Sequence, residues 1–376
     1  MATRVRMLET AAQFDSMRGE ILSATERVLA SGQWIGGPEV RALEEEIARA
    51  TACRHAIALA SGTDAILLSL KALGIGPGDD VVVPTFTFFA TAGAVVNAGA
   101  RPVFADIEPE SMNLDPGSLA RVATPKTKAV IPVDLFGRCA DYDAILAVAR
   151  PRGISVLEDA AQAIGATQNG APAGSFGSIA AFSFYPTKNL GACGDAGMAT
   201  TNDEALARMV RVYANHGSDG GGYIHAVVGT NSRLDAIQAA ILRAKHARLG
   251  EWQAARDGNA AFYRSALAGC SAISLPAPIP AGWRHVYHQF VIRVVRGSRD
   301  ACRSYLAERG IDSGIYYPLP LHLQECFAHL GGRRGDLPNS ERAAREVLAL
   351  PVHPALTEGD LGRVAAAISE WGRAQL

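Results

Sequence analysis

Apolar and polar positions follow two alternating patterns along most of the chain. Short apolar runs bounded by Gly, Pro, Asp or Asn predict buried strands, and amphipathic stretches between them predict helices. The expected strands are Ala56–Leu59, Val81–Pro84, Pro102–Ile107, Ala129–Leu135, Ser155–Glu158, Ala180–Phe184 and Met198–Thr201. The helices between them are expected at Ala65–Leu73, Ala90–Ala98, Asp141–Ala149 and Asp203–Ala214. Such apolar strands alternating with helices predict an α/β fold, with a mostly parallel central sheet covered by helices on both faces.

The two ends of the chain show different patterns. Helices are expected at Phe14–Ala30 and from Pro38 to about Ala50, and a long helix from Arg233 to about Ala268 is expected to break near Gly250. The last third is expected to contain strands at Val286–Val295 and Ile311–Tyr317, with helices at Arg299–Arg309, Ser340–Leu348 and Glu358–Arg373. We therefore expect a large domain over residues 1–249 and a smaller α+β domain over residues 250–376.

Composition narrows the class of protein. Hydrophobic residues make up 48% of the 376 residues and charged residues 19%, so a sizeable core is expected. The net charge of −1 gives no basic excess, and we expect no nucleic-acid partner. No apolar run has the length of a membrane span, and the N-terminus lacks the pattern of a signal peptide. The six cysteines are scattered without metal-ligand spacing, so the sequence predicts a cytoplasmic protein with no metal site and no membrane association.

Lys188 and Asp159 follow two of the predicted strands and form the most informative pair of residues. Asp159 ends the run Val156–Leu157–Glu158, and Lys188 lies just after the strand that ends near Phe184. Pyridoxal phosphate (PLP) chemistry needs this pair, because a lysine amine condenses with the cofactor's aldehyde and a carboxylate keeps its pyridine nitrogen protonated. A lone lysine is usually a solvated surface charge, but that interpretation leaves the buried acid unexplained.

A second feature is a set of small and hydroxylated residues suited to a phosphate group. Ser61–Asp64 follows a predicted strand and opens a helix, where backbone N–H groups and a hydroxyl can bind phosphate. Ordinary helix capping explains the same residues equally well. Ser183 adds a hydroxyl shortly before Lys188. The sequence has no GxGxxG after its first strand and no GxxxxGK[ST], so dinucleotide and P-loop sites lack support.

Several segments of the chain resemble the DegT/StrS-type sugar aminotransferases, which are PLP enzymes of fold type I. The matching segments are SGTDA at 61–65, PTFTFFAT at 84–91, EDAAQ at 158–162, SFYPTKNLGACGDAG at 183–197, GTNSRLDAIQAA at 229–240 and YPLPLHLQ at 317–324. They occur in the family's order over nearly the whole chain. The resemblance therefore implies the fold of aspartate aminotransferase and PLP as the cofactor.

The resemblance also implies roles for the residues around the cofactor. Lys188 is expected to bond covalently to PLP and to move the substrate proton, and Asp159 to pair with the pyridine nitrogen. Gln162 is expected near the phenolic oxygen, and Phe88 over the ring. The implied phosphate ligands are Gly62, Thr63 and Ser183, with Asn231 reaching the phosphate from a neighbouring subunit.

For the substrates, the resemblance implies L-glutamate as amino donor and a keto nucleotide sugar as acceptor, in a homodimer with shared active sites. Arg233, Tyr317 and His322 match positions that face the nucleotide sugar, although a histidine in a Pro-rich loop is more often structural. The sequence around Lys188 resembles that of enzymes that aminate 3-keto sugars linked to dTDP or UDP, in amino-sugar or surface-polysaccharide biosynthesis. This chain has Tyr316 where many relatives have histidine, which bears on sugar recognition.

Four alternatives remain open at this stage. The acceptor could be a 4-keto nucleotide sugar, or it could be a cyclitol or an amino-acid-like ketone. Relatives that dehydrate sugars replace the PLP-bonded lysine by histidine, so Lys188 argues against dehydration. A non-catalytic regulator with the same fold is also possible, but it would not need Lys188, Asp159 and Gln162 together.

Overall fold

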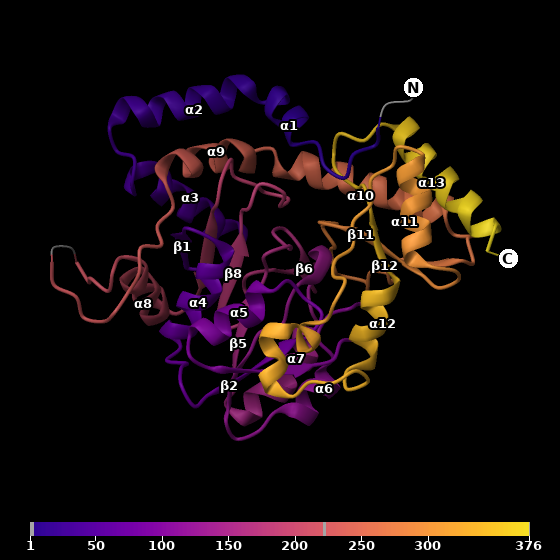
Figure 1. Ribbon diagram of the computed structural model, residues 1–376. Coiled ribbons are helices and arrows are strands. Elements are labelled where there is room, and N and C mark those ends of the chain that lie inside the picture. The colour runs from indigo at the N-terminus through magenta and orange to yellow at the C-terminus, as the bar shows by residue number, and fades with distance from the viewer. Residues whose placement is uncertain (1–3, 221–222, 376) are drawn as a thin grey trace.

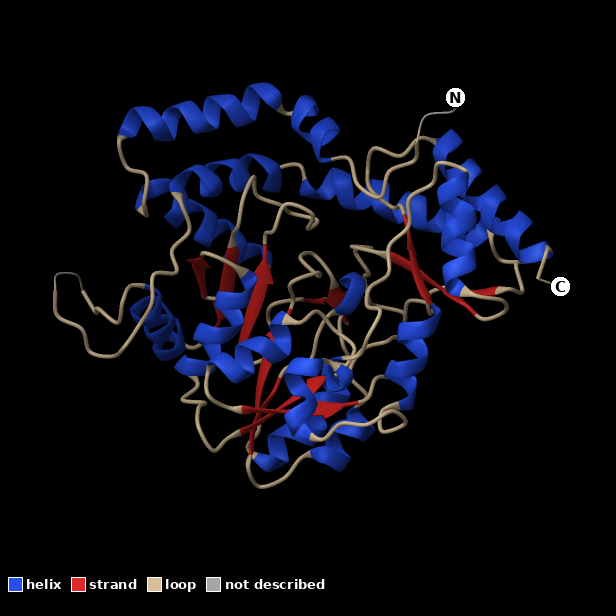
Figure 2. Ribbon diagram, in the orientation of Figure 1, coloured by secondary structure: helices blue, strands red, loops and turns tan. Residues whose placement is uncertain are grey.

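A seven-stranded sheet forms the centre of the larger part of the molecule (Figures 1 and 2). The computed structural model describes residues 4–220 and 223–375. The strands, in spatial order, are β1 (His55–Leu59), β9 (Gly197–Thr201), β8 (Ile179–Ser183), β5 (Ser155–Asp159), β4 (Thr127–Val130), β2 (Asp80–Pro84) and β3 (Arg101–Ala105). β9 runs antiparallel to both of its neighbours, and the other pairs are parallel. The predicted mostly parallel sheet is thus confirmed.

Alternating side chains of the strands enter two separate cores, one on each face of the sheet. In β2, Val82 packs into one core, whereas Val81 and Val83 pack into the other. The first core is completed by α3 (Gly37–Ala50), α6 (Pro116–Val122), α7 (Tyr142–Ala149) and α9 (Ala236–His246). The second is completed by α4 (Gly62–Ala72), α5 (Ala90–Asn97) and α8 (Glu204–Ala214). Helices therefore cover both faces, as expected.

The N-terminal helices lie across α9 on the outside of the large sheet (Figure 1). They are α1 (Thr10–Ser16) and α2 (Arg18–Ser31), where the sequence predicted one continuous helix. Met17 separates them and is buried with Ile21, Ile241 and Trp252 in a small core of its own. The break lets the apolar residue at position 17 face inward at the point where the chain changes direction.

A second, antiparallel sheet lies beside the large one and has its own hydrophobic core (Figure 2). It consists of β10 (Ile273–Ser274), β11 (Phe290–Val294) and β12 (Val347–Leu350), and the helices packed with it are α10 (Leu249–Ala266), α11 (Arg299–Glu308) and α13 (Glu358–Arg373). Val5 also belongs to this core and pairs with the backbone of Gly310 and Asp312. The predicted domain boundary at residues 249 and 250 stays a prediction. A short hairpin, β6 (Thr167–Gln168) and β7 (Ala171–Pro172), completes the strands.

Two sequence predictions for the C-terminal third are wrong in detail. The segment Ile311–Tyr317 forms only isolated bridges, from Ile311 to Val5 and from Gly314 to Ala349. The helix expected at Ser340–Leu348 is α12 (Pro338–Glu346), and β12 follows it directly. The long helix is broken near Gly250, as predicted, because α9 ends at His246 and α10 begins at Leu249. Within residues 4–220 and 223–375, no helix is both long enough and apolar enough to cross a membrane.

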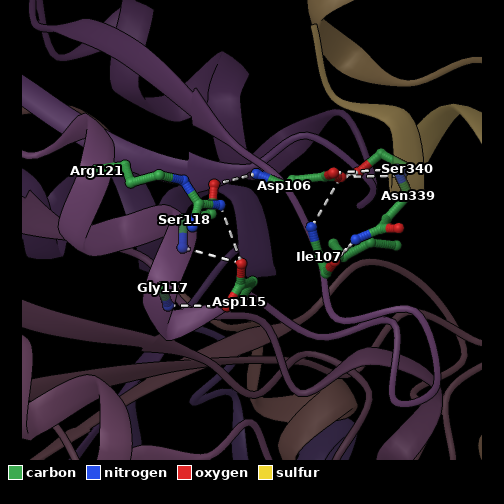
Figure 3. A network of polar contacts seen from close by, with 8 residues as sticks. All are labelled: Asp106, Ile107, Asp115, Gly117, Ser118, Arg121, Asn339 and Ser340. Carbon is green, nitrogen blue, oxygen red and sulfur yellow. Dashed lines mark hydrogen bonds and ion pairs between the residues drawn. The ribbon is translucent and has the colours of Figure 1, made fainter. Parts of the chain in front are cut away.

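Asp106 joins the two parts of the molecule through the first turn of α12 (Figure 3). Its carboxylate accepts backbone N–H bonds from Asn339 and Ser340 at 3.0 and 2.9 Å, and the Ser340 hydroxyl at 2.6 Å. The side chain of Asn339 donates in turn to the carbonyl of Ile107 at 3.0 Å. A carboxylate at a helix N-terminus satisfies otherwise unpaired N–H groups and complements the helix dipole, so this contact holds α12 against the large sheet.

Candidate active site

A cavity of about 680 Å³ lies at the ends of β5 and β8, where Asp159 and Ser183 complete their strands. Ligands in open α/β sheets bind outside the carboxyl ends of the parallel strands, which is where this cavity is found. The residues predicted from sequence that line it are Gly62, Thr63, Phe88, Asp159, Gln162, Ser183, Lys188 and Tyr317. The structure therefore brings together eight of the residues that lie far apart in the sequence.

Asp159 is buried at the base of the cavity and is held by two hydrogen bonds. Its Oδ2 accepts the hydroxyl of Thr91 at 2.8 Å, and its Oδ1 accepts the backbone N–H of Ala161 at 3.2 Å. Burial raises the pKa of Asp159, while these bonds and the charge of Lys188 lower it. The carboxylate is therefore fixed in direction and ready to pair with a cationic group in the cavity.

Lys188 lies in a tight turn after β8, where its backbone N–H donates to the carbonyl of Tyr185 at 2.8 Å. Its side chain is half-buried, and burial lowers the pKa of its amine to about 8, against the opposing effect of Asp159. A lysine ordinarily titrates well above pH 10 and cannot act as a nucleophile or base near neutrality. The lowered pKa makes a neutral amine accessible under mild conditions.

The start of α4 and the end of β8 meet at one wall of the cavity. Ser61 caps α4 by accepting the backbone N–H of Asp64 at 3.1 Å, so the capping interpretation is correct for this hydroxyl. Gly62 packs against Ser183 so closely that a Cβ at position 62 would lie 2.7 Å from the Cβ of Ser183. Glycine is therefore required there, and Gly62 and Thr63, in the first turn where N–H groups have no helical partner, line the cavity together with Ser183.

Gln162 connects two neighbouring parts of the wall. Its Oε1 accepts the backbone N–H of Phe136 at 2.7 Å, and its Nε2 donates to the Tyr317 hydroxyl at 3.3 Å. Phe136 lies in a 3₁₀ turn with a φ of 61°, a left-handed conformation that is costly for a bulky side chain. The ring of Phe88 lies 6.2 Å from that of Tyr317 and is 56% exposed, so one of its faces is free for a ligand.

Asn231 and Arg233 do not line this cavity in the single chain. Both side chains are exposed, and the Arg233 Nε donates to Oδ1 of Asn231 at 3.0 Å. Arg233 instead borders another cavity of about 610 Å³ between α3 and α8. Between them, Ser232 is buried and donates to the carboxylate of Asp64 at 2.7 Å. The segment is thus anchored to α4 through Ser232 while its two neighbours point outward.

His322 is buried outside the cavity. Its Nδ1 lies 2.9 Å from the Thr85 hydroxyl, and its Nε2 lies 3.4 Å from Oε1 of Glu341 in α12. The backbone N–H of His322 also donates to the Thr85 hydroxyl at 2.9 Å. The histidine therefore lies between β2 and α12, a geometry that matches the structural alternative noted from sequence.

Other cavity-lining residues carry polar groups to which the sequence analysis assigned no role. They include Tyr185, Asp195, Arg256, His288 and Gln289. Tyr185 and Asp195 lie inside the segment 183–197, whose match to the family is a signal that could have pointed to them. Arg256, His288 and Gln289 come from α10 and the turn before β11, where no local pattern signals a site.

Comparisons with known proteins give a single family. The sequence profile of the DegT/DnrJ/EryC1/StrS aminotransferase family matches residues 15–369. The chain belongs to this family. It is 46% identical to a protein of Geobacillus stearothermophilus named pleiotropic regulatory protein, covering 98% of this chain and 99% of that one. It is also 46% identical to the UDP-N-acetyl-3-dehydro-alpha-D-glucosamine 3-aminotransferase of Acidithiobacillus ferrooxidans, covering 97% of both.

Solved structures agree with this assignment. DesV of Streptomyces venezuelae, solved in complex with a ketimine intermediate, superposes with a TM-score of 0.95 at 43% identity over 99% of both chains. The protein is therefore an aminotransferase of fold type I. The family is PLP-dependent, and solved neighbours carry the cofactor in its pyridoxal and pyridoxamine phosphate forms.

The cavity fits PLP on its own geometry. The first turn of α4 offers the backbone N–H groups of Gly62 and Thr63 beside Ser183, whereas that of Asp64 donates to Ser61. The lysine with a lowered pKa and the buried, oriented carboxylate line the same cavity. An aldehyde, a pyridine nitrogen and a phosphate each require one of these features, so the residues present match all three parts of the cofactor.

Proposed function

We propose that this aminotransferase moves an amino group from L-glutamate to a keto nucleotide sugar, with a 3-keto hexose linked to dTDP or UDP as the favoured acceptor. The observation that supports it most is the single cavity in which Lys188, Asp159 and the Gly62–Ser183 approach lie together. The choice of acceptor follows the names of relatives with 40–46% identity, which act at the 3-position of dTDP- or UDP-linked sugars.

The proposed residue roles follow from position and charge. The bound cofactor supplies the electron sink that makes the substrate's α-proton acidic. Lys188, as a neutral amine, removes that proton from the donor and returns one to the acceptor carbon. Asp159, held by Thr91, keeps the pyridine nitrogen protonated. Gly62, Thr63 and Ser183 bind the phosphate. Phe88 covers the ring, and Gln162 lies by the phenolic oxygen.

The acceptor site is proposed to lie across two subunits of a homodimer. Asn231 and Arg233 are exposed and outside their own chain's cavity, which suits residues that reach a partner's site. Near them in the sequence, Tyr223, Ile224 and Val228 are 84–99% exposed, an arrangement typical of an interface that is covered in an assembly. Tyr317 completes the acceptor side. His322 is buried away from the cavity, so it does not enter the proposed acceptor set.

The proposed cellular context is the cytoplasm, in an amino-sugar or polysaccharide pathway. All six cysteines are free thiols, which suits a reducing compartment. A regulatory role without catalysis is the second candidate, because one relative with 46% identity is named as a regulator. The intact Lys188, Asp159 and Gln162 favour the enzyme.

A panel of acceptors tests the proposal. The PLP-loaded protein is incubated with L-glutamate and with 3-keto and 4-keto nucleotide sugars, and amino-sugar products are measured by mass spectrometry. We expect amination of 3-keto substrates. Amination confined to 4-keto sugars or cyclitols would replace the favoured acceptor, and no product with any ketone would favour the regulatory candidate.

A further inference from the structure

Arg256 occupies an unusual place beside the catalytic lysine. It lies in α10 with 5% of its surface exposed, and it borders the main cavity. It also borders a smaller cavity of about 200 Å³ on the other side of Lys188. Leu8, Lys188 and Arg256 are the residues common to the linings of both cavities. The guanidinium therefore lies at the junction where the two spaces meet.

The guanidinium has no charged partner in the part of the chain that the structure describes. Its Nη1 donates to the carbonyl of Tyr287 at 3.1 Å, and burial alone lowers its pKa, to about 10. It therefore remains a cation at neutral pH. A buried guanidinium offers five N–H donors, and burying its charge without an anion is costly. Such an arrangement indicates a site whose anion arrives with a ligand.

Asp159 and Glu9, two acidic groups near Arg256, interact with other cations, and His288 beside it is neutral. His288 lines the main cavity, and burial followed by the charges of Lys188 and Arg256 holds its pKa well below the ordinary value. Asp159 interacts with Lys188 at the base of the main cavity. Glu9 borders the smaller cavity, and its carboxylate lies 3.5 Å from Arg6. The proposed place of the cofactor's phosphate is the start of α4, which leaves the junction beside Arg256 for an anion of the substrate.

We infer that Arg256 binds a carboxylate of the amino-acid donor at the junction of the two cavities. A planar guanidinium matches a carboxylate through paired N–H···O bonds, and a donor's α-carboxylate is one bond away from the carbon whose proton Lys188 moves. The inference rests on the proposed function, because it assigns the donor end of that same site. Arg256 and Lys188 border the same two spaces, which places the donor between them.

A carboxylate for Arg256 could also come from the acceptor, as the uronate group of a sugar acid. The two sources are separated by measuring each half-reaction alone. The donor half-reaction is followed by the absorbance of the PLP-loaded enzyme on addition of L-glutamate, and the acceptor half by that of the pyridoxamine form on addition of a keto sugar. Binding without turnover is measured by calorimetry with glutarate, a dicarboxylate that lacks the amine.

Arg256→Met is the central variant, with Arg256→Lys as the conservative one. Arg264→Met is the matched control, because Arg264 lies in the same helix and bonds to the carbonyls of Pro276 and Ala277 outside both cavities. We expect Arg256→Met to weaken glutarate binding and raise the half-saturating glutamate concentration about 10- to 100-fold, the range for a charged hydrogen-bonded pair. Arg256→Lys should recover part of the loss, and Arg264→Met should show none.

The outcomes separate the inference from the proposed function. Unchanged glutarate binding in a folded, PLP-loaded Arg256→Met protein overturns the inference, as does a loss confined to uronate acceptors. No donor half-reaction in the wild-type protein would instead overturn glutamate as donor. If the methionine variant does not fold, modification of wild-type arginines by phenylglyoxal decides the question by mass spectrometry. Glutarate must then protect Arg256, and equal modification with and without glutarate rejects the site.

Discussion

The hydroxyl of Thr91 donates to Oδ2 of Asp159 at 2.8 Å, joining the first turns of α5 to the end of β5. Both residues are buried, and no water needs to enter for the carboxylate to be held. The backbone N–H of Ala161 holds the other oxygen at 3.2 Å. The direction of this carboxylate is therefore fixed by two elements far apart in sequence before any ligand binds.

Replacing Thr91 by valine should slow the chemistry while the protein folds and retains PLP. The valine keeps the shape but removes the bond that orients Asp159, and we expect the glutamate half-reaction to slow about tenfold, equivalent to about 1.4 kcal/mol. Stopped-flow absorbance measures the rate. Thr51→Val is the matched control, because Thr51 is buried and its hydroxyl donates at 2.8 Å to the carbonyl of Ile47, remote from the cavity. Equal rates in the Thr91 variant and the wild type would exclude the orienting role.

Asp159→Asn tests the carboxylate itself. An amide cannot stabilise a protonated pyridine nitrogen as a carboxylate does, so proton removal from the donor should fall by at least about 100-fold. The variant should still hold the cofactor through Lys188. Single-turnover spectra with glutamate provide the measurement, and conversion at the wild-type rate would remove Asp159 from the mechanism.

Lys188 links activity to the pH dependence of stability. Lys188→Ala or Lys188→Met should abolish turnover, because the same amine is proposed to anchor the cofactor and to move the proton. In the cofactor-free protein its pKa is lowered to about 8, so its contribution to the free energy of unfolding is present at high pH and is lost as pH falls toward 8. Lys188→Met should therefore be more stable than the wild type at pH 7, by of the order of 1 kcal/mol because the side chain keeps some solvent contact.

Urea unfolding of the cofactor-free proteins at pH 7 and above about pH 11.5 measures the Lys188 effect. The stability difference should shrink at the higher pH, where the wild-type lysine is neutral in both folded and unfolded states. A methionine variant that is less stable than the wild type at pH 7 would show that the amine is not destabilised by burial.

A buried carboxyl pair lies behind Asp159, formed by Asp134 and Glu158. Both side chains are fully buried, and burial is the largest cause that raises the pKa of each. Glu158 accepts backbone N–H bonds from Gly174 and Phe176 through its two oxygens. Asp134 accepts the Tyr142 hydroxyl and a backbone N–H at Oδ1, and its Oδ2 has no other hydrogen-bond partner among the described residues. Because burial raises the pKa of both carboxyls, we predict that the pair shares a proton and that Asp134 carries it.

Asp134→Asn should preserve the pair's bonding, since the amide supplies an N–H where the proton was. We expect a change in unfolding free energy below about 1 kcal/mol, whereas Asp134→Ala should cost about 2–3 kcal/mol by leaving buried groups unpaired. Raised carboxyl pKa values mean that stability falls as pH rises above the ordinary carboxyl range. Urea unfolding between pH 5 and 9 should show that the unfolding free energy falls less steeply with rising pH in Asp134→Asn than in the wild type. If Asp134→Asn and Asp134→Ala lose equal unfolding free energy, the proton does not lie on Asp134.

The sequence predicted the large sheet and the cluster at its edge because both rest on local patterns. Parallel strands place their carboxyl ends together, so Asp159 and Ser183 had to lie near each other once their strands were recognised. In contrast, the apolar run Val347–Leu350 looks like the end of a helix by local pattern. Pairing with β11, more than fifty positions earlier, makes it a strand. Long-range pairing of this kind leaves no local trace.

The same contrast between local pattern and long-range packing decides which individual side chains could be predicted. Gly62 and Lys188 lie in segments whose spacing marks them, and the cavity contains both. Arg256 is one arginine among several in an amphipathic helix, and only the packing of α10 against the N-terminal segment brings it beside Lys188. His322 lies in a segment that matches the family, yet its burial against Thr85 and Glu341 depends on where α12 packs.

The arrangement of Asn231 and Arg233 leads to a prediction about assembly. Both side chains are exposed and bonded to each other, while Ser232 between them is buried against Asp64. If they complete a partner's site, Lys188→Ala and the Asn231→Ala/Arg233→Ala double variant should each be inactive alone. Mixed with subunit exchange, half of the dimers are hybrids, and each hybrid has one site with a full set of residues. Activity should then return to at most about a quarter of the wild-type value per site.

Native mass spectrometry verifies that the two variants have exchanged subunits. A sample that contains Lys188→Ala alone is the negative control. No recovery despite verified exchange would place Asn231 and Arg233 in their own chain's site or outside the site, because a shared site must be restored in the hybrid.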